Sequence, residues 1–275
     1  MFYHDSKLQY PVKVETPNPM FAKFLQQAIG GVEGEMRVAL QYLFQAWGAR
    51  GPAKYRDMLL ETACEELGHI EMLATAVALN LEGAPTAMVE EAAKDPTVAA
   101  VLGGMNPRHV LSTTLAAMPM DSQGVPFDAS HVYATGNIAA DMLANVTAES
   151  TGRMLAVKLH NYTDDPGMKD MLKYMIARDT MHQNQWLAAY EEVGGAKAHP
   201  IPNTFPQSEE NQSVNYTFYG TKRDQSRPTQ GAWTQGESVD GKGTFKSEWL
   251  EPMGQELGLP PAQPWQGVQE AQVGK

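Results

Sequence analysis

The chain has 275 residues and a formal net charge of −11 at pH 7, so it is long enough for one large domain or for one domain with a long appendage. The acidic charge argues against nucleic acid and anionic membranes as partners, and no apolar stretch of about 18 residues predicts a membrane span. Cys64 is the single cysteine, which excludes an intrachain disulfide, and the N-terminal residues lack the core of a signal peptide, so we expect a cytoplasmic protein.

Four long helices are predicted in residues 1–195, where apolar residues recur with helical spacing. Their predicted ranges are 19–47, 52–81, 130–162 and 166–193. Asn18 and Asp165, each followed by a proline, are the predicted caps of the first and fourth helices, and Ser130 is the predicted cap of the third. A short helix is also expected at 95–104, in the long segment that connects the second helix to the third.

From residue 196 the composition changes, because Pro, Gly, Gln and Ser recur and the apolar periodicity fades. Large aromatic residues such as Trp233, Phe245 and Trp249 argue against a free disordered tail. We therefore expect 196–275 to form an extended arm that packs on the bundle or on neighbouring subunits.

Each predicted helix carries an acidic residue in the seam that should face the other helices. These seams repeat at alternating spacings of three and four residues and are otherwise apolar or small. The interrupting acids are Glu35, Glu66, Glu149 and Asp179. In the second and fourth helices His69 or His182 follows the acid by three residues, a spacing that places both side chains on one side of a helix.

This pattern predicts a pair of bound metal ions. An isolated ionised carboxylate in an apolar interior is very unfavourable, and several would also repel one another, so cations are required. Carboxylate and imidazole ligands suit manganese or iron. One Glu from each of two helices, with an acid-x-x-His pair from each of the other two, is the arrangement of ferritin-like di-metal bundles. The predicted fold is therefore all-α: a ferritin-like four-helix bundle with a long crossover segment and an irregular C-terminal arm.

Two neighbouring acids compete for the predicted ligand positions. Glu65 also lies within reach of His69, at a spacing of four residues. Arg178 occupies the equivalent position in the fourth helix, which favours Glu66 as the ligand. Glu33 points about 160° away from the direction of Glu35 and is predicted to be solvated.

The residues around these positions are similar to those of a known family. They include the segments MFYHDSKLQYPVK, IGGVEGE, TACEELGHIEM, TGNIAADM, NVTAES, TDDPGMKDML and ARDTMHQ. Over nearly its whole length the chain resembles the manganese catalases, non-haem enzymes of ferritin-like fold. The resemblance implies that Glu35 and His69 bind one manganese ion, that Glu149 and His182 bind a second, and that Glu66 bridges them. It also implies that hydrogen peroxide is disproportionated to water and oxygen while the ions cycle between Mn(II) and Mn(III).

The resemblance also implies supporting roles. Tyr42 is expected to donate a hydrogen bond to the bridging carboxylate, and Asp179 to act as a base that moves protons without binding metal directly. Some family members carry a Glu where this chain has Asp179, and an Arg where it has Ala148. Arg153, one turn further on, is a poor substitute for that arginine. These departures leave the metal ligands intact but affect proton transfer.

A calcium ion and an assembly are further implications of the resemblance. The calcium ligands would be Asp57, Glu61, Asn215 and Thr217, where the C-terminal arm meets the second helix. The implied assembly is a homo-hexamer held together by the arm.

Two alternative functions stay open at this point. A di-iron oxidase or peroxidase of the same fold would use the same types of ligand. Close relatives also include proteins described as spore-coat components, so the chain could instead be mainly a structural, spore-associated subunit. Metal analysis combined with a measurement of oxygen release distinguishes these functions.

Overall fold

The computed structural model describes residues 5–82, 108–201, 205–221 and 230–251. The chain divides into two compact units, Met1–Gln207 and Ser208–Lys275. The first unit thus continues past residue 195, where the prediction ended the bundle. The helix predicted at 95–104 lies outside the described residues. In the part of the chain that the structure describes, no helix is both long and apolar enough to cross a bilayer.

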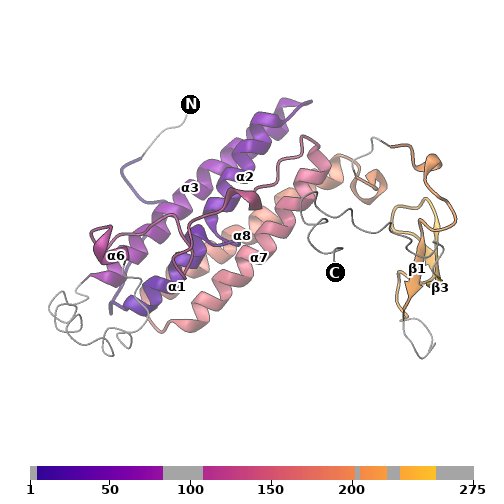
Figure 1. Ribbon diagram of the computed structural model, residues 1–275. Coiled ribbons are helices and arrows are strands. Elements are labelled where there is room, and N and C mark those ends of the chain that lie inside the picture. The colour runs from indigo at the N-terminus through magenta and orange to yellow at the C-terminus, as the bar shows by residue number, and fades with distance from the viewer. Residues whose placement is uncertain (1–4, 83–107, 202–204, 222–229, 252–275) are drawn as a thin grey trace, which may run out of the picture. The chain divides into compact units, whose positions relative to one another are not determined.

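Two helical hairpins form the first unit. α1 (Pro19–Gly30) and α2 (Glu35–Gly48) pack against α3 (Ala53–Leu81), and α7 (Ile138–Tyr162) packs against α8 (Pro166–Glu192). The short helices α6 (Arg108–Leu111) and η1 (Ala129–His131) lie in the connection between the hairpins, and η2 (Gly195–Ala198) follows α8. Figure 1 shows the long helices side by side. The predicted all-α four-helix bundle is confirmed.

Side-chain caps fix where several helices begin. Asn18 and Asp165 accept hydrogen bonds from backbone amides in the first turns of α1 and α8, as predicted. The prediction that Ser130 caps the third helix is wrong. α7 begins at Ile138 and is capped by Asn137, because the preceding Gly136 has a φ of +77°, which is not a helical conformation.

The first predicted helix, 19–47, is two helices in the structure, separated by residues 31–34. A Cβ atom on Gly34 would lie 2.7 Å from the carbonyl oxygen of Ile29, so the chain turns back on α1 where only glycine fits. The break makes Glu35 the first residue of α2.

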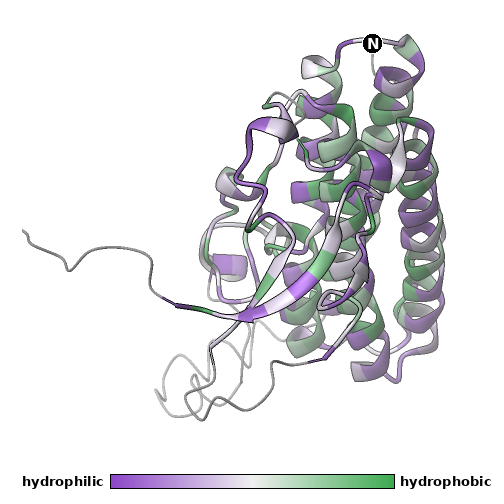
Figure 2. Cartoon of the chain, turned by 90° about the vertical axis from the view of Figure 1, so that its right-hand side faces the viewer, coloured by the Kyte–Doolittle hydropathy of each residue, from purple (hydrophilic) through white to green (hydrophobic). Residues whose placement is uncertain are grey.

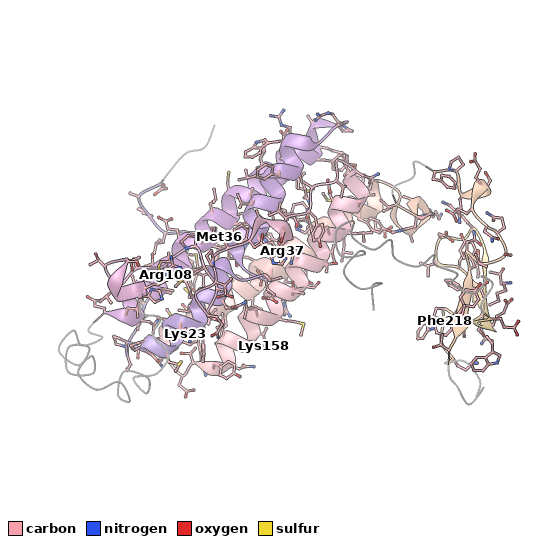
Figure 3. All side chains as sticks on the ribbon, viewed as in Figure 1. Lys23, Met36, Arg37, Arg108, Lys158 and Phe218 are labelled. Atoms are coloured by element: carbon pink, nitrogen blue, oxygen red, sulfur yellow. The ribbon has the colours of Figure 1, made fainter. Side chains whose placement is uncertain are left out.

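The hydrophobic core of the bundle is divided into two clusters. One cluster includes Leu25, Leu73, Leu172 and Met175, and the other includes Tyr42, Leu59, Met142 and Trp186. Hydrophobic residues gather between the helices, and hydrophilic residues cover much of their outer faces (Figure 2). Side chains fill the space between the helices (Figure 3). On both α3 and α8 the acid and the histidine of the predicted site lie between the residues of the two clusters.

Gln26 of α1 holds the connection between the hairpins against the bundle. Its Nε2 donates hydrogen bonds to the carbonyl oxygens of Met118 and Met120, and its Oε1 accepts one from the amide of Met118 at 3.1 Å. The two chain segments approach so closely that a Cβ atom on Gly30 would lie 2.5 Å from the backbone of Met120.

The second unit contains a small sheet of strand order β1-β3-β2. β1 (Thr217–Gly220) pairs with β3 (Thr244–Trp249) in parallel, and β2 (Gly236–Glu237) pairs with β3 in antiparallel orientation. The helix η3 (Gln207–Glu209) precedes it. The arm therefore has more regular structure than its composition predicts. Its packing on the bundle or on a neighbouring subunit stays a prediction.

Candidate metal centre

The acids and histidines predicted to face inward are buried in the middle of the bundle. Glu66, His69 and His182 are at most 1% exposed, and Glu149 and Asp179 are 4% and 5% exposed. Glu35, at the N-terminus of α2, is 14% exposed in its side chain. These residues come from α2 and α3 of one hairpin and from α7 and α8 of the other, so the centre depends on the packing of both hairpins.

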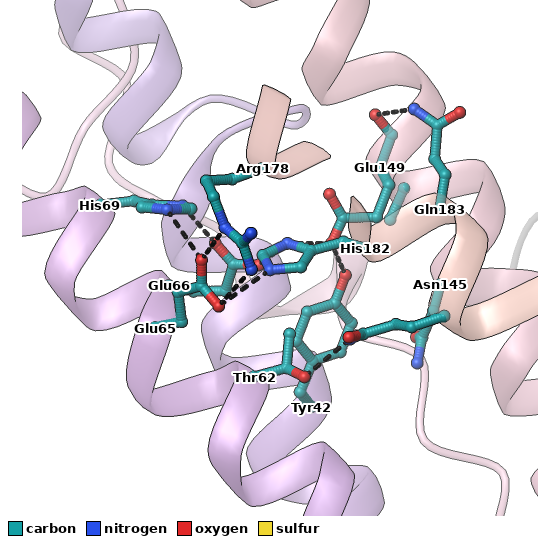
Figure 4. Close-up of polar contacts among 12 residues, drawn as sticks. Tyr42, Thr62, Glu65, Glu66, His69, Asn145, Glu149, Arg178, His182 and Gln183 are labelled. Atoms are coloured by element: carbon teal, nitrogen blue, oxygen red, sulfur yellow. Dashed lines mark hydrogen bonds and ion pairs between the residues drawn. The ribbon is translucent and has the colours of Figure 1, made fainter. Parts of the chain in front are cut away.

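These side chains form two groups that share one residue. Glu35, Glu66 and His69 make one group, and Glu66, Glu149 and His182 make the other. Within each group the possible ligand atoms lie within 4.8 Å of one another. The shared carboxylate faces both histidines, because Glu66 Oε2 lies 2.7 Å from His69 Nδ1 and Glu66 Oε1 lies 2.8 Å from His182 Nδ1 (Figure 4). One carboxylate can therefore serve two cations.

The other two carboxylates complete the groups at longer distances. Glu35 Oε2 lies 3.8 Å from His69 Nδ1, and Glu149 Oε1 lies 3.4 Å from His182 Nδ1. Both histidines thus turn the same ring nitrogen, Nδ1, toward the carboxylates of the centre.

The environment of the centre shifts the pKa values of its three glutamates in different directions. Burial and the charge of Glu66 raise the pKa of Glu35 to about 7 and also raise the pKa of Glu149. Burial likewise acts to raise the pKa of Glu66, but His69 and His182 outweigh it and hold that pKa below the usual range of a glutamate. Glu66 is therefore the carboxylate that stays ionised most readily.

The donor atoms of this cluster fit divalent transition-metal ions. Among the described residues, Glu66 Oε1 and both ring nitrogens of His69 and of His182 are buried without a hydrogen-bond partner. Such orphaned polar atoms are costly in a protein interior unless something else satisfies them. Carboxylate oxygens with imidazole nitrogens suit manganese or iron. Cys64 is exposed and adds no thiolate.

Tyr42 contacts the centre, but at a different carboxylate from the one predicted. Its hydroxyl donates a hydrogen bond to Glu149 Oε1, so the expectation that it donates to Glu66 is corrected. The reason is geometric: Tyr42 is fully buried against Trp186, with ring centroids 4.8 Å apart, and its hydroxyl meets α7. Burial and the nearby Glu149 raise the pKa of Tyr42 well above its usual value, so it remains a donor.

Asp179 is buried beside the two groups but supplies no atom to either of them. Burial and the charge of Glu35 raise its pKa to about 9. Ala148 is buried and brings no positive charge. Arg153 points to Thr180, because its Nε donates a hydrogen bond of 3.1 Å to Thr180 Oγ1.

Glu65 is a residue of the site that the sequence-based ligand assignment set aside. Its carboxylate forms an ion pair with Arg178 and lies close to both histidines (Figure 4). The spacing of four residues from Glu65 to His69 was the available signal, but that spacing alone does not distinguish a ligand from a supporting residue.

Buried amides also line the bundle next to the centre. Asn145, one turn before Glu149 on α7, accepts hydrogen bonds of 2.8 Å from Gln41 and Gln45. Gln41 and Gln45 also bind the backbone of Tyr133, in the connection between the hairpins. Polar amides with no distinctive spacing carry no signal in a sequence, so this cluster was not predicted.

The predicted calcium ligands lie in different units of the chain. Asp57 and Glu61 are exposed on α3, whereas Asn215 and Thr217 belong to the second unit. Neither acid belongs to a group of possible metal ligands found among the described residues.

The comparisons with known proteins point to one family. A model of the manganese-containing catalase family matches residues 1–264. A protein named manganese catalase from Bacillus subtilis is 44% identical over 264 residues, which cover 96% of each chain. Protein CotJC of Bacillus subtilis strain 168 is 34% identical over 191 residues, or 70% of this chain and 94% of the relative. The crystal structure of KatB, a manganese catalase from Anabaena, has the same fold, with a TM-score of 0.70 and 23% identity over 90% of this chain and 99% of that one.

Proposed function

This chain belongs to the manganese-containing catalase family, and from that premise we propose that its buried cluster binds two manganese ions. The enzyme is a catalase, with hydrogen peroxide as its substrate. Glu35 and His69 would hold one ion, Glu149 and His182 would hold the other, and Glu66 would be shared between them. The observation that supports this proposal most directly is that the two groups of possible ligands have Glu66 in common.

Manganese held by these residues would supply the redox chemistry, since two ions that each change between +2 and +3 would provide the two electrons of each half-reaction. The protein supplies the environment. Glu66 presents one oxygen to each histidine and stays ionised. Leu73, Met175 and Trp186 are at most 2% exposed and lie one turn from the acid or histidine of their helix, so apolar side chains next to the centre should limit access to molecules as small as peroxide.

Asp179 is the proposed group that holds and moves protons. It is buried next to the ligand groups without belonging to them, and burial raises its pKa, which supports a role in holding a proton. Asp179→Ala is expected to keep the manganese and to lower kcat by about 10²–10⁴-fold, the usual contribution of a positioned acid or base. Loss of half of the manganese would instead identify Asp179 as a ligand.

The decisive experiment combines metal analysis with an oxygen electrode. Protein produced without excess of either metal should contain manganese rather than iron and should release oxygen from hydrogen peroxide. Glu66→Ala should lose both metals or all turnover with little change in helix content, while Glu71→Ala, an exposed acid on the same helix, should behave as the wild type. Iron occupancy, or peroxide consumption without oxygen release, would favour a di-iron peroxidase. No oxygen release from protein with both sites filled would favour a structural subunit.

The calcium ion and the homo-hexamer also belong to this proposal. Asp57 and Glu61 are exposed one turn apart on α3, and carboxylate oxygens are ligands that calcium prefers. Calcium analysis of the purified protein tests that site. Apolar side chains exposed on the bundle support an interface with another chain, and the number of six subunits comes from the resemblance to the family.

A further inference from the structure

We propose that Glu65 is a positioning residue that holds both imidazoles of the metal centre in one orientation. This inference rests on the proposed manganese sites and adds to them a group that binds neither ion. It starts from the position of Glu65 on the side of the histidines opposite to Glu66.

The Glu65 carboxylate faces the outer nitrogen of each histidine. Glu65 Oε2 lies 3.2 Å from His182 Nε2, and Glu65 Oε1 lies 3.7 Å from His69 Nε2. The inner nitrogens, Nδ1, face Glu66 instead. Each ring therefore lies between an inner and an outer carboxylate, and a single outer carboxylate serves histidines from two different helices (Figure 4).

This placement has a direct chemical consequence. A neutral imidazole carries one N–H, and the acceptor that this N–H finds determines which nitrogen keeps a free lone pair. A cation bound at Nδ1 would leave the imidazole N–H of His69 and of His182 on Nε2, where Glu65 is the nearby carboxylate that can accept it. An outer carboxylate also makes the imidazole a stronger ligand.

Glu65 is itself held in place from two directions. Arg178 of α8 donates hydrogen bonds to both of its oxygens, from Nε to Oε1 and from Nη2 to Oε2 at 3.2 Å. Gln9 of the N-terminal segment donates to Oε1 at 3.2 Å and to the hydroxyl of Tyr174 at 2.9 Å. Arg178 balances the charge of Glu65, so the carboxylate does not add a further uncompensated negative charge to the cluster.

The two acid-x-x-His helices share the spacing of acid and histidine but differ at the residue just before the acid. Glu65 precedes Glu66 on α3, and Arg178 precedes Asp179 on α8. With an acid at both positions, two outer carboxylates would repel each other across the bundle. With one acid and one arginine, a single ion pair supports both histidines.

The test measures manganese binding, not activity. Glu65→Gln keeps the shape of the side chain but removes its charge, and Glu71→Gln is the matched control on the exposed face of α3. Manganese affinity, measured by competition with a chelator, should fall about 10–100-fold in Glu65→Gln and stay unchanged in Glu71→Gln. The electron paramagnetic resonance spectrum of the manganese-loaded variant should also change, because the imidazoles are less constrained.

A second variant separates positioning from folding. Arg178→Gln should weaken manganese binding by less than Glu65→Gln, and the double variant should be no weaker than Glu65→Gln alone, because Arg178 acts through Glu65. Wild-type affinity and spectrum in Glu65→Gln would overturn the inference while leaving the two manganese sites in place. Unchanged spectra with a lower thermal midpoint of the metal-free protein would also overturn it, because that result assigns Glu65 a purely structural role. A wild-type protein that binds no manganese would overturn the proposed function itself.

Discussion

At the scale of single residues, the histidines of the centre bind protons more tightly than free imidazole does. Burial opposes this, but the charge of Glu66 and the carboxylates around each ring outweigh it and raise the pKa of His69 and of His182 well above the usual value. Asp179 also binds a proton readily, since burial and Glu35 raise its pKa to about 9. Only a neutral imidazole can bind a metal ion, so at neutral pH a cation must displace these protons.

Manganese binding is therefore expected to release protons near pH 7. Each imidazole should lose one proton on binding, and the affinity should fall as the pH falls, because the raised pKa values keep both rings protonated in the metal-free protein over the whole neutral range. Calorimetric titration with manganese in buffers of different ionisation enthalpy measures the number released. His131→Gln, on η1 outside the centre, should release as many protons as the wild type. A binding enthalpy independent of the buffer would contradict this prediction.

At the scale of helices, the ends of a helix can be predicted when the residues that fix them lie close by in the sequence. Asn18 and Asp165 cap their helices through side chains a few residues away, and both were predictable. The turn after α1 was missed, because the apolar periodicity on both sides of it suggested one continuous helix, although Gly30, Gly31 and Gly34 are a local signal of a break. The structure adds the reason for the glycine at position 34, which is its close approach to the carbonyl oxygens of Ala28 and Ile29.

Gly30 offers a test of the contact between α1 and the connection that crosses it. A Cβ atom in Gly30→Ala would lie 2.5 Å from the backbone of Met120, which cannot move as easily as a flexible side chain. The variant should lose about 1–3 kcal/mol of unfolding free energy through overpacking. Thermal unfolding of the metal-free protein measures this as a lower midpoint. Gly48→Ala is the control, because a Cβ atom there meets nothing within 4 Å, and it should match or exceed the wild type. Equal midpoints for the two variants would disprove the tight contact.

At the scale of the whole molecule, the polar centre divides the core that stabilises the bundle. The sequence predicted which residues meet there, because the helical seams carry acids and histidines at ligand spacing between apolar residues. It did not predict the partners that come from other parts of the chain. Gln9, Arg178 and Tyr133 reach the centre or its neighbouring amides from distant positions in the sequence. Such contacts depend on how the hairpins and the N-terminal segment pack, and no local pattern records them.

The outside of the bundle carries the last prediction, which concerns assembly. Phe44 and Trp47 of α2 are each 52% exposed, and their rings pack edge to face with centroids 5.1 Å apart. Paired aromatic side chains exposed on a single chain are typical of surfaces that another chain covers. For the proposed homo-hexamer, light scattering should give a mass about six times the 30.1 kDa of one chain.

The aromatic pair can be tested against an exposed aromatic residue elsewhere on the bundle. Replacing both Phe44 and Trp47 by serine should lower the mass measured by light scattering, because an interface core loses affinity when its large apolar residues are truncated. Tyr162→Ser, at a position 73% exposed near the end of α7, should leave the mass unchanged. A wild-type mass of 30.1 kDa would rule out the hexamer. An unchanged assembly in the double variant would show that a different surface, such as the C-terminal arm, holds the subunits together.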